Sequence, residues 1–129
     1  MFRSLLLAAA IGLATGSLSS AALAESDPEA GKKVYRKCVA CHSLEAGKKK
    51  VGPSLHGVVG GVPGVVEGYN YSKAMKAFGE AGTVWDEAAL DAFLEAPRKA
   101  VKGTKMGFPG LKKAEDRANV ITYLKQATE

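Results

Sequence analysis

The sequence predicts an all-α domain in which several short helices are joined by long loops. Apolar residues recur at helical spacing near residues 27–37, 86–96 and 114–126, with helix-start signals at each. No stretch shows the alternation of apolar and polar residues that is typical of a half-buried strand. Residues 43–68 are glycine-rich and irregular, and a loop of this length in a small domain indicates a large ligand around which it wraps.

The N-terminal residues 1–24 predict a bacterial secretory signal peptide. Arg3 gives the basic start, residues 5–13 the apolar core, and Ala22-Leu23-Ala24 a cleavage site of the A-x-A type. An uncleaved N-terminal anchor is the alternative, but the segment is short and rich in small residues for a membrane span. We expect cleavage after Ala24, export to the periplasm, one domain over residues 25–129 and no transmembrane span in the mature chain.

The first helix is predicted to run from Asp27 to about Lys37. Asp27 is a capping residue, Pro28 suits the first turn, and Glu29 complements the positive end of the helix dipole. Gly31 lies inside this helix, where glycine costs about 1 kcal/mol relative to alanine. We therefore expect the backbone of another segment to approach the helix closely at Gly31.

The later helices carry similar signals. Ser72 caps a short helix that Gly79 and Gly82 should break, and Asp86 caps a clearer helix that stops at Pro97. Two further helical segments are predicted, at 98–102 and 114–126. The stretch between them, 103–110, contains three glycines and a proline and cannot form a regular element.

Cys38-Val39-Ala40-Cys41-His42 has the C-x-x-C-H spacing that attaches a c-type haem. Two thiols at this spacing match the two vinyl groups of the haem, and the adjacent imidazole then meets the iron. Cys38 and Cys41 are the only cysteines, so no second pair completes a four-ligand zinc site. A thioredoxin-type redox pair needs a βαβ context, whereas these flanks are helical. A structural disulfide beside an incidental histidine is the other alternative.

Charge and composition narrow the range of partners. The formal net charge is +5, and loss of Arg3 with the signal peptide lowers it to +4. No long basic run is interleaved with aromatic residues, so nucleic acid is not an expected partner. An acidic docking surface on another protein fits this charge better. No nucleophile–base pair or pair of catalytic carboxylates is evident, which favours a carrier over an enzyme.

Taken together, these residues resemble class I cytochrome c, of the type of bacterial cytochrome c2 and mitochondrial cytochrome c. The likeness covers nearly all of the mature chain and rests on five stretches, 38–42, 52–57, 68–71 with Trp85, 103–108 and 120–125. The resemblance implies a small fold of several helices and long loops wrapped around one covalently bound haem c. It also implies that the first and last helices cross closely.

The resemblance assigns the ligands of the haem. Cys38 and Cys41 would hold it covalently, and His42 and Met106 would bind the iron from opposite sides. The backbone carbonyl of Pro53 would accept a hydrogen bond from the other ring nitrogen of His42, which fixes the tautomer. The remaining cofactor-binding residues would meet the propionates or line the pocket: Tyr71 and Trp85 with Thr104 nearby, and Leu55, Leu90, Leu94, Phe108 and Leu124.

Two other residues could compete with Met106 as the second iron ligand. Met75 lies in a helical stripe, where a methionine is usually a packing residue. His56 lies in a turn 14 residues after His42, where an exposed or hydrogen-bonded histidine is the more ordinary interpretation. Met106 lies in a loop between glycines, which leaves its thioether free to point at a metal, so we favour Met106.

The expected function follows from the iron ligands. Imidazole and thioether together fill both axial positions, and the soft thioether in an apolar pocket favours ferrous iron. This implies a soluble monomeric one-electron carrier of high reduction potential, with a haem peroxidase or a gas-binding haem sensor as alternatives. The expected donor is a quinol–cytochrome c reductase. An oxidase, a photosynthetic reaction centre and a periplasmic reductase all stay open as acceptors.

Overall fold

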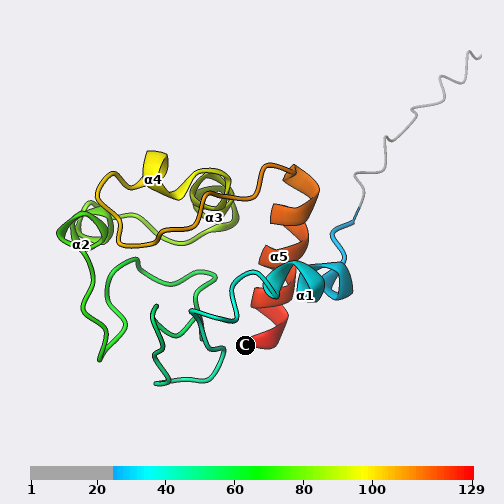
Figure 1. The fold of residues 1–129 in the computed structure, drawn as a ribbon, viewed down its shortest axis with the longest axis horizontal. Coiled ribbons are helices and arrows are strands. Elements are labelled where there is room, and N and C mark those ends of the chain that lie inside the picture. The colour runs from blue at the N-terminus through cyan, green and yellow to red at the C-terminus, as the bar shows by residue number, and fades with distance from the viewer. Residues whose placement is uncertain (1–24) are drawn as a thin grey trace, which may run out of the picture.

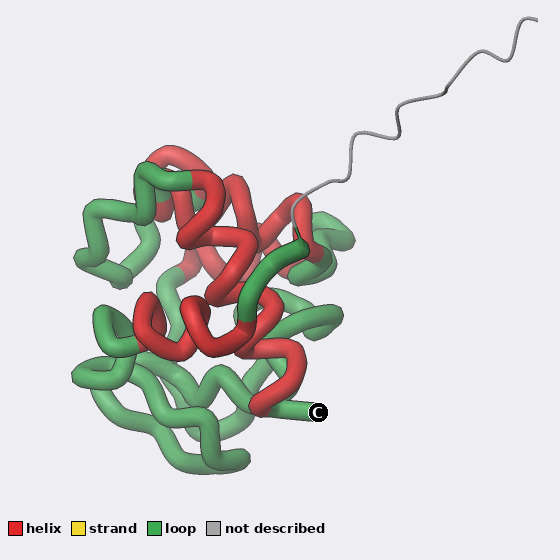
Figure 2. Tube along the Cα trace, turned by 90° about the vertical axis from the view of Figure 1, so that its right-hand side faces the viewer, coloured by secondary structure: helices red, strands yellow, loops and turns green. Residues whose placement is uncertain are grey.

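A computed structural model describes residues 25–129, and the predicted signal peptide lies outside the described residues. Within this range the chain forms helices and no strands, which confirms the all-α prediction (Figure 1). The helices are α1 (Pro28–Tyr35), α2 (Lys73–Glu80), α3 (Glu87–Glu95), α4 (Pro97–Ala100) and α5 (Ala114–Ala127). None of them is long and apolar enough to cross a membrane. The long loops gather mainly below the helices in the view of Figure 2.

The crossing of α1 over α5 is the main helix–helix contact (Figure 1). Gly31 lies at the crossing point, and a Cβ placed on it would overlap the backbone carbonyl of Asn119. Beside it, the rings of Tyr35 and Tyr123 pack with their centroids 5.6 Å apart. The close backbone approach expected at Gly31 is therefore confirmed.

The start of α1 is also tied to α5. The side chain of Asp27 caps the helix by accepting a hydrogen bond from the Glu29 amide at 2.9 Å. The Asp27 amide in turn donates to Oδ1 of Asn119 at 2.8 Å. Regular helix ends at Tyr35, two residues earlier than expected, but turns continue because the Cys38 amide donates to the Tyr35 carbonyl at 2.8 Å.

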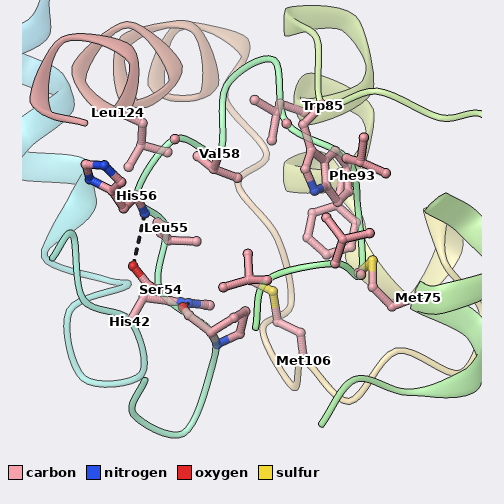
Figure 3. A pocket seen from close by; sticks show the side chains of 18 of the residues that line it. His42, Ser54, Leu55, His56, Val58, Met75, Trp85, Phe93, Met106 and Leu124 are labelled. Carbon is pink, nitrogen blue, oxygen red and sulfur yellow. Dashed lines mark hydrogen bonds between the residues drawn. The ribbon is translucent and has the colours of Figure 1, made fainter. Parts of the chain in front are cut away.

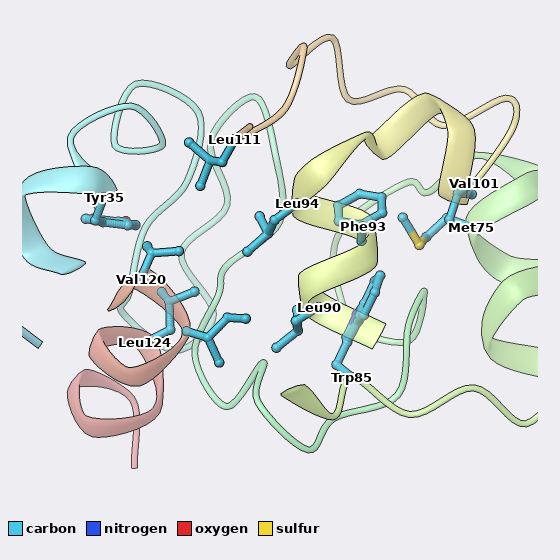
Figure 4. Close-up of a cluster of buried hydrophobic side chains, with 11 residues drawn as sticks. Tyr35, Met75, Trp85, Leu90, Phe93, Leu94, Val101, Leu111, Val120 and Leu124 are labelled. Carbon is cyan, nitrogen blue, oxygen red and sulfur yellow. The ribbon is translucent and has the colours of Figure 1, made fainter. Parts of the chain in front are cut away.

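The buried core joins α3 to α5 (Figure 4). Its apolar members are Tyr35, Met75, Trp85, Leu90, Phe93, Leu94, Val101, Leu111, Val120, Ile121 and Leu124. At the edge of this core Arg117 is only 7% exposed, and its Nε donates to Asp91 of α3 at 2.7 Å. The same guanidinium donates to the carbonyls of Leu111 and Lys112 at 3.0 and 3.1 Å. Arg117 therefore joins α3, α5 and the loop before α5.

The helix α2 is longer than expected. Ser72 caps it as predicted, accepting from the Met75 amide at 3.0 Å, but the helix passes through Gly79 and ends at Glu80. The prediction that Gly79 breaks the helix was wrong, because Gly79 serves a contact with another segment. A Cβ on Gly79 would overlap the carbonyl of Pro63, which the loop presses against the helix. Gly82, with φ +90°, follows the end of the helix.

The closeness of the α1–α5 crossing predicts the effect of Gly31→Ala. Alanine is the better helix former by about 1 kcal/mol, so propensity alone would stabilise α1. We expect net destabilisation of about 1–3 kcal/mol instead, because the added methyl overpacks the crossing. Denaturant unfolding of the haem-loaded protein measures it. Lys32→Ala, on the exposed side of α1, should change stability by less than about 0.5 kcal/mol. An unchanged or higher stability of Gly31→Ala would contradict the close crossing.

Candidate functional site

A cavity of about 290 Å³ lies where the long loops meet α3 and α5 (Figure 3). Its lining is mostly apolar and comes from segments far apart in the sequence. The residues are Cys38 and His42 of the motif, loop residues between Pro53 and Val66, Tyr71, Met75, Trp85, Leu90, Phe93, Leu94, Met106, Val120 and Leu124. A second cavity of about 120 Å³ adjoins it, and His42, Pro53, Tyr71, Met75 and Met106 line both.

The histidine of the motif is held in one orientation. Nδ1 of His42 lies 2.7 Å from the carbonyl oxygen of Pro53, so this nitrogen carries the proton and donates, and Nε2 keeps its lone pair. Burial lowers the pKa of His42, against the opposing effect of the hydrogen bond to Pro53. Burial thus favours the neutral imidazole, which is the form that binds a metal.

Gly52 explains how the backbone can pass so close to this ring. A Cβ on Gly52 would lie 2.5 Å from Cε1 of His42, which no real contact tolerates. Tyr35 adds a further restraint, since its hydroxyl donates to the His42 carbonyl at 3.1 Å. The imidazole thus sits in a cradle that a larger residue at position 52 would fill.

The two thiols of the motif are free and stand one turn apart. The amides of Cys41 and His42 both donate to the carbonyl of Cys38, at 3.0 and 2.9 Å. Cys38 lines the main cavity, where burial and the neighbouring Cys41 raise the pKa of its thiol. Cys41 is exposed and lines the second cavity. The turn therefore presents both sulfurs and the imidazole around the same space.

Met106 and Met75 occupy different parts of the cavity. In Figure 3, Met106 is drawn near His42, whereas Met75 lies on the side of Trp85 and Phe93. Met106 comes from the loop after α4 and is partly buried, and its amide donates to Oγ1 of Thr104 at 3.3 Å. Met75 is a buried residue of α2 within the apolar core. Of the two thioethers, the one of Met106 belongs to a loop segment and lies near His42.

The structure brings most of the other predicted site residues to the same place. Tyr71 and Trp85 line the main cavity, and burial raises the pKa of the Tyr71 hydroxyl. Thr104 lines the second cavity. Phe108 packs against the core without lining either cavity, and its role in the pocket stays a prediction. His56 is exposed at the rim, where its amide donates to Ser54 Oγ at 3.2 Å.

Sequence reasoning missed several lining residues. Phe93 and Val120 lie within the predicted helices at 86–96 and 114–126 but were not assigned to the pocket, and the loop valines 58, 62, 65 and 66 gave no periodic signal. For Phe93 the signal was available, because it stands between Leu90 and Leu94, two residues that were assigned to the pocket wall.

The donor set fits a covalently attached haem. Two free thiols, an oriented imidazole and a thioether line the two adjoining cavities, whose walls are otherwise mainly apolar. Thioether bonds need the two thiols, and a low-spin iron is held by nitrogen and sulfur donors of these kinds. The fold and the site together define a small all-α domain built to hold a c-type haem.

Comparisons with known proteins agree with this class. The sequence model of the family "Cytochrome c" matches residues 28–128. Cytochrome c-554 of Methylosinus trichosporium is 46% identical over 95% of this chain and 89% of its own length. Cytochrome c2 of Rhodoblastus acidophilus is 50% identical over 78% of this chain and 92% of its own. The solved structure of cytochrome cH from Methylobacterium extorquens superposes with a TM-score of 0.72 at 43% identity, covering 78% of this chain and 99% of that one.

The chain belongs to the cytochrome c family. Accordingly it binds a covalently attached haem c, for which Cys38 and Cys41 of the C-x-x-C-H motif provide the two thiols. It is a haem-based electron carrier that works with redox partners and is not an enzyme.

Proposed function

We propose that this protein is a periplasmic one-electron carrier whose haem iron is bound by His42 and Met106 and which moves electrons between membrane redox complexes. The observation that carries the proposal is that His42 and Met106, 64 positions apart, line the same apolar cavity. The bound haem would supply a single-electron ferric–ferrous couple. The chain would hold the haem in one geometry and shield it from water.

Three features of the site would tune this couple, and two of them, Met106 and the apolar walls, act in the same direction. The hydrogen bond from His42 to Pro53 fixes the ring and raises its basicity as a ligand. Met106 contributes a soft thioether, which favours the reduced metal. The apolar walls penalise the more charged oxidised state by desolvation. The two last effects act together toward a high reduction potential.

A haem peroxidase or a gas-binding sensor is not favoured by this arrangement. Both need an axial position that is open or weakly occupied, whereas the cavity here is lined by both an imidazole and the Met106 thioether, two groups that would occupy both axial positions. Relatives named cytochrome c2 support the carrier proposal.

Export to the periplasm is supported by two observations. The match to cytochrome c-554 spans 123 residues, more than the 105 that follow Ala24, so the likeness extends into the N-terminal segment. The described residues that directly follow the proposed cleavage site are also anchored to α5, since Ser26 Oγ hydrogen-bonds with Thr122 and the Asp27 amide donates to Asn119. Cleavage after Ala24 would leave this anchoring intact.

The mature protein is expected to have the mass of the polypeptide from Glu25 to Glu129 plus one haem. Both thioether bonds survive acid–organic extraction, whereas a haem held only by its axial ligands does not. Intact-mass spectrometry of the periplasmic fraction after such extraction measures both points. Retained residues 1–24 would contradict the proposed processing, and haem that extracts freely would contradict the covalent attachment.

Replacement of Met106 by leucine is expected to keep the haem attached and to abolish the far-red sulfur–iron absorption band. The reduction potential should fall by on the order of 0.1 V, within the span of about 0.8 V that axial ligands set, and the ferrous protein should bind carbon monoxide. Met75→Leu is the matched control, a volume-conserving swap that should cost less than about 1.5 kcal/mol and keep the band. Loss of the band in Met75→Leu and not in Met106→Leu would reverse our assignment.

We further propose that partners dock near the exposed edge of the haem site through basic residues. Lys37 directly precedes Cys38 and is exposed, and Lys50 lies over the motif because its ammonium donates to the Val39 carbonyl at 2.8 Å. An acidic surface on a quinol–cytochrome c reductase as donor, or on an oxidase, reaction centre or periplasmic reductase as acceptor, would complement these charges.

The rate of electron transfer with such a partner is expected to fall with salt. Raising the ionic strength from 0.01 to 0.15 M shortens the Debye length from about 30 to about 8 Å, and we expect the second-order rate to fall about tenfold. Stopped-flow oxidation by membranes of the source organism measures this. Lys37→Glu should flatten the dependence more than Lys125→Glu, the same charge change in the exposed last turn of α5. A rate independent of salt would show that docking is mainly apolar.

A further inference from the structure

The buried hydroxyl of Tyr35, at the end of α1, is a polar group that packing does not require. Tyr35 is 8% exposed, and its ring belongs to the apolar core. Phenylalanine would fill the same space without a polar atom, whereas a buried hydroxyl is stable only with a hydrogen-bond partner. That partner is the backbone carbonyl of His42, 3.1 Å from the hydroxyl oxygen. The hydroxyl of Tyr35 therefore serves this bond and not the packing of the core.

His42 is bonded at three of its atoms to three separate segments. Its ring bonds the Pro53 carbonyl at 2.7 Å, and its amide donates to the Cys38 carbonyl at 2.9 Å. Among the described residues, the Tyr35 hydroxyl supplies the one hydrogen bond that reaches the carbonyl of His42. The bonds at the amide and at the carbonyl fix the main chain on either side of Cα, and with it the direction of the Cα–Cβ bond. Without the Tyr35 bond, the carbonyl side of His42 keeps no hydrogen bond of its own.

The helix crossing determines where the Tyr35 hydroxyl lies. Gly31, one turn earlier on the same face of α1, lets the helix contact the backbone of Asn119. The ring of Tyr35 then packs on the ring of Tyr123 from α5, with the centroids 5.6 Å apart and the planes inclined by 47°. A position that α5 determines is thereby passed through one hydrogen bond to the backbone of the histidine.

We infer that Tyr35 is a positioning residue: its hydroxyl holds the main chain of His42 against the crossing of α1 and α5 and so determines the orientation of the imidazole toward the haem. This role rests on the proposed function, in which His42 binds the haem iron. Tyr35 acts through His42 and does not itself line either of the two adjoining cavities. The bond from Nδ1 to Pro53 fixes the rotation of the ring, whereas the bond from Tyr35 fixes the backbone from which the ring projects.

Removal of the Tyr35 hydroxyl leaves a buried acceptor without a donor. His42 is 8% exposed, so its carbonyl regains a partner only when the segment opens to water. Loss of the donor therefore favours local opening by about fivefold to hundredfold, the range expected for an unsatisfied buried polar group. The Nδ1 proton of His42 reports this opening, because it exchanges with solvent only when its bond to Pro53 is broken.

The experiment compares Tyr35→Phe with the matched control Tyr123→Phe in the haem-loaded protein. Each variant loses one hydroxyl and keeps both rings of the pair, but only Tyr35 bonds His42. NMR of the ferrous protein measures exchange of the His42 Nδ1 proton. In the ferric protein, the shifts of the haem methyl groups report the orientation of the axial imidazole.

Tyr35→Phe is expected to exchange the Nδ1 proton about fivefold to hundredfold faster than the unmodified protein and to change the pattern of methyl shifts. Tyr123→Phe should change the exchange rate by less than about twofold and keep the methyl shifts. The methyl shifts are a property of the native state, so a role confined to stability does not move them.

Faster exchange with unchanged methyl shifts in Tyr35→Phe would show that the hydroxyl stabilises the fold without orienting the ligand, and would overturn the inference. Equal exchange rates and equal methyl shifts in Tyr35→Phe and Tyr123→Phe would overturn it as well, and would leave the proposed ligands intact. Absence of the shifted signals of an iron-bound histidine in the unmodified ferric protein would instead overturn the proposed ligation by His42.

Discussion

The backbone contact between Gly31 and Asn119 is the constraint on which the rest of the structure depends. With no side chain at the crossing, α1 lies directly on α5, and the two helices then deliver their residues to one place. The turns after α1 lead within three residues from Tyr35 to Cys38, while α5 supplies Leu124 to the same cavity. A helix separation larger by one methyl group would move the attachment motif away from the wall that α5 provides.

The buried core of this small domain and the lining of its main cavity consist largely of the same residues. Seven of the eleven buried apolar core residues also line the main cavity, among them Trp85, Leu90 and Val120. A chain of this size buries a modest fraction of its surface, so the walls of the cavity need an apolar partner on their inner side. The covalently attached haem supplies that partner in the folded state, and burial of its apolar surface against these walls stabilises the fold.

Features with a local signal could be predicted from the sequence, and features that depend on a distant backbone could not. Four features can be recognised directly from the sequence: the C-x-x-C-H motif, the caps Ser72 and Asp86, and the unusual glycine at position 31. Gly79 was misread because the reason for it, the carbonyl of Pro63, lies 16 positions away. Lys105 shows the same limit, since a lysine in a polar loop resembles a solvated charge until the fold places the Asn70 carbonyl beside it.

The His42 side of the site is restrained by more contacts than the Met106 side. His42 is buried and restrained by the Pro53 carbonyl, by the close backbone at Gly52 and by Tyr35, so its geometry exists before a metal is bound. Met106 is only partly buried against the core, and the hydrogen bond of its amide to Thr104 is local. Electron transfer is fast when neither oxidation state requires the ligands to move. A preformed imidazole meets this condition from its own side, and under the proposed ligation the thioether side meets it only if the loop of Met106 keeps one position in both oxidation states.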